Sequence, residues 1–141
     1  TFVTADAVVF CMGHVLMVRR GAYPGKGLLA FPGGFLDAQS DHSLRAAALR
    51  ELREETRIRV PPAVLNSSIV DSHVFDAPHR SARGRTITQA FKIQLNERQL
   101  PRVRGSSDAV GAQWIPFGEL RSEQCFEDHY QIFEYFLGKQ A

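Results

Sequence analysis

The stretch FPGGFLDAQSDHSLRAAALRELREETRI, residues 31–58, decides the fold of this chain. Its second half, Leu44–Thr56, contains neither Pro nor Gly and is rich in Ala, Leu, Arg and Glu, which are strong helix formers. Three side chains just upstream can accept N-cap hydrogen bonds: Ser40, Asp41 and Ser43. An apolar stripe at i, i+4 and i+8 would face the core: Leu44, Ala48 and Leu52.

Three carboxylates lie in the last turns of this predicted helix, within about a third of its circumference: Glu51, Glu54 and Glu55. Glu51 and Glu55 are like charges at i, i+4, and they sit near the negative end of the helix dipole. A divalent cation would offset this repulsion, and Mg²⁺ takes oxygen ligands. The glutamate spacing alone is equally consistent with a metal site and with a solvated acidic helix face.

Pro32-Gly33-Gly34 precedes the helix and allows a sharp, close-approaching backbone. A loop of this kind that leads into a helix can carry a phosphate group past the carboxylates. Glycine loop and acidic helix together predict a site for a phosphorylated ligand and a cation.

This segment resembles the Nudix box, G-x5-E-x7-R-E-U-x-E-E-x-G-U with U aliphatic. Seven positions match: Gly34, Arg50, Glu51, Leu52, Glu54, Glu55 and Ile58. The family's isolated Glu is His42 here, after a loop that is two residues longer, so a carboxylate that usually supports the box Arg is expected to be missing. The family's Gly is Arg57, which must adopt a left-handed conformation or end the helix differently.

A second informative stretch, residues 71–91, carries three cations within six residues: Arg80, Arg83 and Arg85. Arginine matches phosphate oxygens bidentately, although a basic loop alone is more often simply solvated. Beside a metal site these arginines would hold the other side of a diphosphate. Three rings could stack on a base, with core packing the commoner role for phenylalanine: Phe35, His73 and Phe75.

Three segments, GHVLMVRR, HVFDAP-x-R-S-x-RGRTIT-x-AF and CFEDHYQI, extend the similarity from about Val3 to Phe136. They resemble the Nudix half of bacterial bifunctional nicotinamide mononucleotide adenylyltransferase/ADP-ribose pyrophosphatases. The resemblance implies a single Nudix domain over residues 1–141 and an adenylyltransferase domain fused before it. Because the chain starts at Thr1 and not at Met, we expect it to be the C-terminal piece of such a protein.

The resemblance also implies a function in NAD metabolism, the Mg²⁺-dependent hydrolysis of ADP-ribose to AMP and ribose 5-phosphate. The expected metal ligands are the Gly33 carbonyl, Glu51, Glu54 and Glu55, with Mn²⁺ as an alternative metal. Arg50 would orient Glu51 or Glu55. The expected substrate contacts are Gly34, Phe35, Arg80, Arg83 and Arg85. The general base stays open among the box glutamates and four later carboxylates: Glu97, Asp108, Glu127 and Asp128. Asp128-His129 is more simply explained as a helix cap and a packing residue.

The rest of the chain predicts an α+β fold, and the resemblance implies a mixed β-sheet sandwiched between α-helices. Strands are expected at 2–10, 14–19, 28–31, 69–75, 85–95 and 109–115, and a closing helix at 123–137. Residues 96–107 are polar, with Pro and Gly, and predict a mobile loop.

The composition limits the kinds of partner and cellular setting that we expect for this chain. A net charge of +2 and a pI of about 8.7 are too mild to argue for nucleic acid. Cys11 and Cys125 form neither a metal motif nor a disulfide framework, which favours a reducing, cytoplasmic setting. No apolar run in this sequence approaches membrane length, so we expect neither a signal peptide nor a membrane partner. Pyrophosphatases of this type are often homodimers, and the apolar first strands could pair across chains.

Three alternatives stay open. The substrate could be another nucleotide: a damaged nucleoside triphosphate, NADH or a dinucleoside polyphosphate. The domain could instead sense ADP-ribose without cleaving it, as regulators of Nudix ancestry do, although Glu51, Glu54 and Glu55 are retained. It could also be a structural domain that stabilises or dimerises an attached enzyme.

Overall fold

A central mixed sheet organises the computed structural model, which describes residues 1–104 and 111–138. The strands run in the order β3-β2-β1-β6-β5, with β4 paired to β1 and β7 paired to β2. Their bounds are β1 Phe2–Cys11, β2 His14–Arg19, β3 Leu29–Ala30, β4 Gly33–Phe35, β5 Ile69–Phe75, β6 Thr86–Leu95 and β7 Ala112–Pro116. The helices are α1 Leu44–Thr56, α2 Pro62–Ser67 and α3 His129–Leu137, with 3-10 turns at Phe117–Glu119 and Ser122–Gln124. The predicted α+β class is confirmed.

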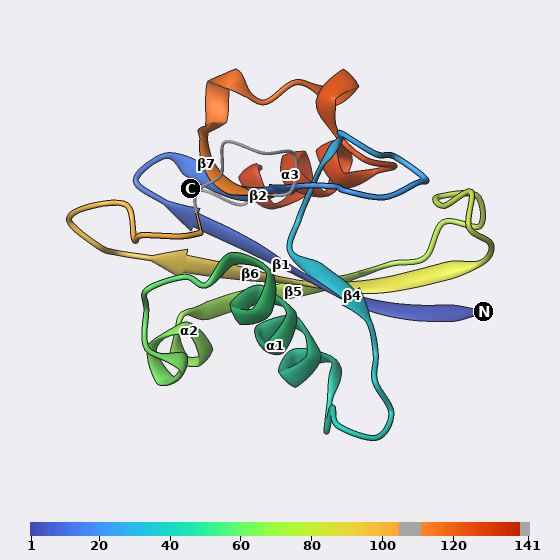
Figure 1. Cartoon of the computed structure of the whole chain (residues 1–141), viewed down its shortest axis with the longest axis horizontal. Helices are drawn as coiled ribbons and strands as arrows, with labels where there is room; N and C mark the ends of the chain where they lie inside the picture. Colours follow the sequence, from blue (N-terminus) through green and yellow to red (C-terminus); the bar gives the residue numbers. More distant parts are fainter. Residues whose placement is uncertain (105–110, 139–141) are drawn as a thin grey trace.

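Helices cover both faces of the sheet (Figure 1), with α1 and α2 on one side and α3 on the other. β1 is central and buried on both faces, so its side chains alternate between two cores. Ala7 and Val9 join the cluster that contains Leu52 of α1, whereas Val8 and Phe10 join the cluster that contains Phe133 of α3. These contacts pack α1 against one face of β1.

Two pairings of β1 place the two motif-bearing segments, residues 31–58 and 71–91, side by side. β1 pairs in parallel with β6, from Phe2↔Thr86 to Cys11↔Leu95, which brings the loop before β6 to the N-terminal end of β1. β4 pairs antiparallel with the same end, with Ala5 opposite Gly34 and Asp6 opposite Gly33. The glycine pair therefore lies between β1 and the C-terminal half of α1.

The closing helix was predicted from residue 123 but begins only at His129. Before it, Cys125 forms a parallel bridge with Leu29, and the Phe126 N–H donates to the Leu29 carbonyl oxygen at 2.8 Å. Glu127 then takes a left-handed conformation with φ 47°. These strand-like contacts hold residues 125–127 out of the helix.

Two short elements were not predicted. Helix α2 starts at Pro62. Pro61-Pro62 was interpreted only as the end of the preceding helix, but proline is also well tolerated in the first turn of a new helix. β4 pairs with β1 where a loop was expected. The predicted strand 109–115 is found as Ala112–Pro116; residues 109 and 110, and the end of the expected loop 96–107, lie outside the described residues.

Helix α1 itself has the predicted bounds. Across residues 1–104 and 111–138, no helix is long and apolar enough to span a bilayer.

Candidate functional site

Both ends of α1 are fixed by the chain itself. The Ser43 hydroxyl accepts from the Ala46 N–H at 3.0 Å and caps the start of the helix. At the end, Arg57 adopts the left-handed conformation, φ 53° and ψ 34°, and its N–H donates to the Arg53 carbonyl oxygen at 3.0 Å. Of the two outcomes foreseen for Arg57, the structure therefore takes the left-handed one, which costs about 1 kcal/mol in a residue other than glycine.

The glycine pair of β4 lets α1 approach the sheet. A Cβ on Gly34 would lie 2.5 Å from the Glu51 Oε2 atom, and a Cβ on Gly33 would lie 2.2 Å from the Asp6 Oδ1 atom and 2.4 Å from the Ala5 carbonyl oxygen. The Gly33 N–H donates to Glu55 Oε1 at 3.3 Å. Only glycine at both positions leaves room for the two carboxylates.

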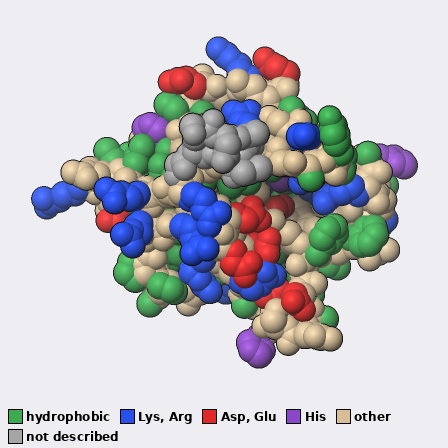
Figure 2. Space-filling view, viewed as in Figure 1, with side chains coloured by type: hydrophobic (Ala, Val, Ile, Leu, Met, Phe, Trp, Pro, Cys, Tyr) green, Lys and Arg blue, Asp and Glu red, His purple; other side chains and the backbone are tan. Residues whose placement is uncertain are grey.

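Glu55 is the electrostatic centre of the site. Burial raises its pKa, and the neighbouring Glu51 raises it further through a hydrogen bond and through its charge. Two carboxylates that share a poorly hydrated site favour either a proton or a cation between them. Figure 2 shows acidic side chains gathered near the middle of this face of the molecule, with basic side chains beside them.

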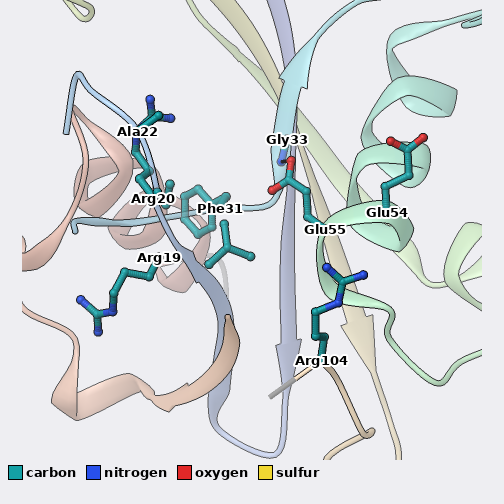
Figure 3. A pocket seen from close by; sticks show the side chains of 11 residues that line it. Arg19, Arg20, Ala22, Phe31, Gly33, Glu54, Glu55 and Arg104 are labelled. Atoms are coloured by element: carbon teal, nitrogen blue, oxygen red, sulfur yellow. Dashed lines mark hydrogen bonds between the residues drawn. The ribbon is translucent and has the colours of Figure 1, made fainter. Parts of the chain in front are cut away.

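The donor set fits a hard divalent cation, because carboxylate oxygens converge on a cradle that a Cβ would fill. Within residues 1–104 and 111–138, however, no three acidic, His or Cys side chains already surround one point. Glu51 contacts Arg50, and the Glu54 side chain is 61% exposed and points away from Glu55 (Figure 3). Ligation would require a side-chain rotation of Glu51 or Glu54.

Arg50 is held by Asp41. Its Nε donates to Asp41 Oδ1 at 2.7 Å and its Nη2 donates to Asp41 Oδ2 at 2.8 Å, while Nη1 reaches Glu51 and Glu54. The Asp41 side chain is only 2% exposed, and its hydrogen bonds with Arg50 lower its pKa to about 2. The expectation that the box arginine lacks a supporting carboxylate is therefore wrong: Asp41 supplies it, and the adjacent His42 is exposed.

The three loop arginines do not act as a group. Arg80 is buried, with a side chain 3% exposed, and donates to both Asp128 oxygens at 2.9 and 2.8 Å. The Arg83 guanidinium lies over the rings of Phe35 and Phe126, 5.4 and 5.3 Å from their centroids. Arg85 is exposed. Arg83 and Phe35, which is 50% exposed, therefore form an accessible pair, whereas Arg80 stabilises the loop.

The other predicted rings are mainly structural. Phe75 packs against Phe136 at 6.2 Å between centroids, and His73 contacts the Tyr135 hydroxyl at 3.0 Å. His129 accepts from the Phe31 N–H at 3.0 Å and stacks on the Phe31 ring, as the packing interpretation expected. Asp128 precedes α3 but makes no capping hydrogen bond from its side chain; it holds Arg80 instead.

Of the carboxylates considered as general base, Glu97 is exposed and Glu127 accepts from the Ser81 hydroxyl at 2.6 Å and from Arg83. Asp128 is paired with Arg80, and Asp108 lies outside the described residues. Of these candidates, Glu51 and Glu55 are the ones that lie at the glycine pair.

A cavity of about 440 Å³ opens beside these carboxylates. Its charged and aromatic lining consists of Arg19, Arg20, Phe31, Glu54, Glu55 and Arg104 (Figure 3). Sequence reasoning did not single out Arg19 and Arg20, which end the segment GHVLMVRR, or Arg104, which lies in a loop without a motif. It also missed Asp6, a buried carboxylate at Gly33 that accepts from the Thr88 hydroxyl at 2.8 Å. Burial raises the pKa of Asp6 to about 6.

Residues 1–136 match the family model of the NUDIX domain. The chain belongs to the NUDIX family. The family and the Nudix fold predicted from the box and the flanking segments are thereby confirmed.

Several relatives share this NUDIX domain. The bifunctional NMN adenylyltransferase/ADP ribose pyrophosphatase of Francisella tularensis, complexed with AMP and a manganese ion, is 40% identical at a TM-score of 0.90, over 99% of this chain and 42% of that chain. The NUDIX domain of Shewanella oneidensis NrtR, complexed with ADP ribose, is 26% identical at a TM-score of 0.79, over 100% of this chain and 89% of that one.

Two of the curated proteins that match this chain are each 26% identical to it over 135 residues. One is an ADP-ribose pyrophosphatase of Methanocaldococcus jannaschii, matched over 96% of this chain and 72% of the relative. The other is an ADPR responsive transcriptional repressor of Acinetobacter baylyi, matched over 93% of this chain and 51% of the relative. The chain thus spans about half of that repressor and less than half of the Francisella protein. Family match and pyrophosphatase relatives support the predicted enzyme class, a Nudix pyrophosphohydrolase.

Proposed function

We propose that this NUDIX domain hydrolyses the diphosphate bond of ADP-ribose to AMP and ribose 5-phosphate. The observation that carries the proposal is the half-buried Glu55 carboxylate, which contacts the Gly33 N–H and neighbours Glu51 at the mouth of the cavity. A dehydrated carboxylate pair beside arginine side chains is suited to a diphosphate and a cation and is poorly suited to an uncharged ligand.

The chain's own residues would divide the work. Arg50, held by Asp41, keeps Glu51 in place beside the glycine pair. Arg20 and Arg104 line the cavity and would neutralise phosphate oxygens, while the narrow backbone at Gly33 and Gly34 lets the diphosphate approach the carboxylates. Phe35 and Arg83 offer a stacking surface for a planar or ribosyl group. Positioning and charge stabilisation account for most of the rate in phosphoryl chemistry.

Glu51, Glu54 and Glu55, with the Gly33 carbonyl, would hold Mg²⁺ or Mn²⁺, which polarises phosphate oxygens and lowers the pKa of a bound water. The manganese ion of the Francisella relative supports this choice of metal class. Glu55 accepts from the Gly33 N–H and lines the cavity, so it is the residue whose loss should matter most.

The test is AMP release from ADP-ribose, with and without Mg²⁺, in the wild type and in Glu55→Gln. We expect metal-dependent AMP in the wild type and at least a hundredfold loss in the variant, with an unchanged circular dichroism spectrum. Equal turnover in the two proteins would remove Glu55 from the site. Turnover of NADH or a dinucleoside polyphosphate, without turnover of ADP-ribose, would assign a different Nudix substrate.

A second function has its own support. One relative is an ADPR responsive transcriptional repressor, and another is the NUDIX domain of NrtR complexed with ADP ribose. If this domain were a sensor, saturable ADP-ribose binding would occur without any AMP. The retained glutamates favour the hydrolase.

We also propose a cytoplasmic location, a homodimer and a fused adenylyltransferase domain. The bifunctional Francisella relative supports the last of these.

A further inference from the structure

A second groove, of about 710 Å³, lies on the far side of Arg104 from the catalytic cavity. Five arginines line it: Arg53, Arg57, Arg59, Arg102 and Arg104. We call it the arginine groove. Arg104 lines both the groove and the catalytic cavity, so the two are adjacent. Figure 2 shows basic side chains gathered beside the acidic patch on this face.

The arginines of this groove differ from most others in the chain. Most arginine side chains elsewhere in the described residues are engaged by protein acceptors, as Arg45 is by Asn66 and Arg80 by Asp128. Within the described ranges, none of the five groove arginines has an ion pair or a side-chain hydrogen bond to the protein, and all five are exposed. Five neighbouring cations without carboxylate partners repel one another unless anions lie among them.

The groove is built on a fixed backbone. The Arg59 N–H donates to the Arg102 carbonyl oxygen at 2.9 Å, and the Arg104 N–H donates to the Thr56 carbonyl oxygen at 2.7 Å. These bonds join the segment after α1 to the segment before β7. Ile58 and Val60 anchor the floor in the apolar core. The guanidinium groups are therefore presented from a rigid platform and not from a free loop.

We propose that the arginine groove binds phosphate groups of the nucleotide substrate that lie beyond the diphosphate cleaved in the cavity. The inference rests on the proposed function and adds a substrate class: nucleotides with more phosphate than ADP-ribose, such as a 2′-phosphorylated ADP-ribose or a dinucleoside polyphosphate. Arginine forks match phosphate oxygens bidentately, and Arg104 gives a continuous cationic path from the carboxylates to the groove.

The test combines activity with metal-free binding. The variant is Arg57→Asn/Arg102→Gln, because asparagine tolerates the left-handed conformation at position 57. The control is Arg45→Gln/Arg121→Gln, which removes the same charge outside the groove. For each protein, kcat/KM is measured for ADP-ribose, ADP-ribose 2′-phosphate and diadenosine tetraphosphate. Calorimetry measures the binding of inorganic tripolyphosphate without metal.

We expect the wild type and the control to favour at least one extended substrate over ADP-ribose, and the groove variant to lose at least tenfold of that preference. Tripolyphosphate should bind the groove variant at least tenfold more weakly than the control, and its affinity should fall with salt. An unchanged preference or equal tripolyphosphate binding overturns the inference. A third outcome is possible, in which ADP-ribose is not hydrolysed but the difference in tripolyphosphate binding and the activity on an extended substrate are both observed. This outcome would overturn only the proposal that ADP-ribose is the substrate.

Discussion

Asp41 grips Arg50 with both carboxylate oxygens, at 2.7 and 2.8 Å, from a position nine residues earlier in the chain. The bidentate geometry fixes the plane of the guanidinium, and the remaining Nη1 is thereby aimed at Glu51. Asp41 thus acts on the site through Arg50 without touching the glycine pair.

Asp41→Asn should lower kcat roughly 10- to 100-fold, the usual cost of losing a residue that orients a metal ligand. His42→Ala is the matched control, because His42 is adjacent but exposed, and it should retain activity. The measurement is metal-dependent AMP release, with thermal unfolding to check the fold. If His42→Ala is the more damaging change, the support of Arg50 has been assigned to the wrong residue.

Divalent metal should stabilise the fold through Glu55. At a hundredfold excess over its Kd, a ligand adds about 2.7 kcal/mol, which raises Tm by roughly 5–10 °C in a domain of this size. We expect Mn²⁺ to produce such a shift in the wild type, EDTA to reverse it, and Glu55→Gln to lose most of it. Exposed Glu119→Gln is the control.

Without metal at pH 7, Glu55→Gln should be at least as stable as the wild type. Burial raises the pKa of Glu55 to about 9, so at pH 7 a carboxylate that is ionised in the unfolded chain must take up a proton on folding, and glutamine removes that cost. Equal Mn²⁺ shifts in Glu55→Gln and the wild type would contradict a role of Glu55 in binding the metal.

The two glycines should fail in different ways. Alanine at 33 meets the Ala5 backbone, which cannot move aside, so Gly33→Ala should lose about 3 kcal/mol of stability. Alanine at 34 meets only the end of the flexible Glu51 side chain, so Gly34→Ala should lose about 1 kcal/mol but at least tenfold in activity. Urea unfolding and AMP release separate the two effects. A larger stability loss at 34 than at 33 would contradict this division.

Arg80 and Arg83 were both predicted to contact substrate, but their replacement should affect different properties of the protein. Arg80→Gln leaves Asp128 without its partner and should cost roughly 2–3 kcal/mol of stability, less than a fully buried pair because Asp128 is partly exposed. Arg83→Gln should raise KM for ADP-ribose severalfold, because the Arg83 guanidinium is partly exposed over Phe35. It should cost less stability than Arg80→Gln, because Glu127 loses a longer contact, at 3.3 Å, and keeps the Ser81 hydroxyl as a donor. An unchanged KM in Arg83→Gln would exclude it from substrate binding.

The local sequence pattern was sufficient to predict α1, whose bounds follow from helix propensity, capping and the placement of three glutamates on one face. It was insufficient wherever a distant partner decides the outcome. The sequence near residue 125 does not predict the bridge to Leu29, which makes α3 begin later than expected. The sequence near Arg80 likewise does not predict its ion pair with Asp128. Asp41 was visible as an acidic residue, but only the fold shows that the longer loop brings it, and not position 42, to Arg50.

Stability below neutral pH should depend on His129. Burial and the nearby Arg80 lower its pKa to about 3, while its Nδ1 accepts from the Phe31 N–H. Between about pH 6.5 and 3 the unfolded chain binds a proton at this histidine and the folded chain does not, so its contribution to stability falls as pH falls.

His129→Asn keeps an acceptor for the Phe31 N–H but removes this titration. The wild type's free energy of unfolding, relative to His129→Asn, should therefore drop by about 2 kcal/mol between pH 7 and 5. The comparison is needed because burial raises the pKa of Asp6 to about 6, which gives the opposite slope in both proteins. Urea unfolding at pH 7, 6 and 5 measures the difference. A difference that stays constant with pH would mean that the folded chain protonates His129 as readily as the unfolded chain does.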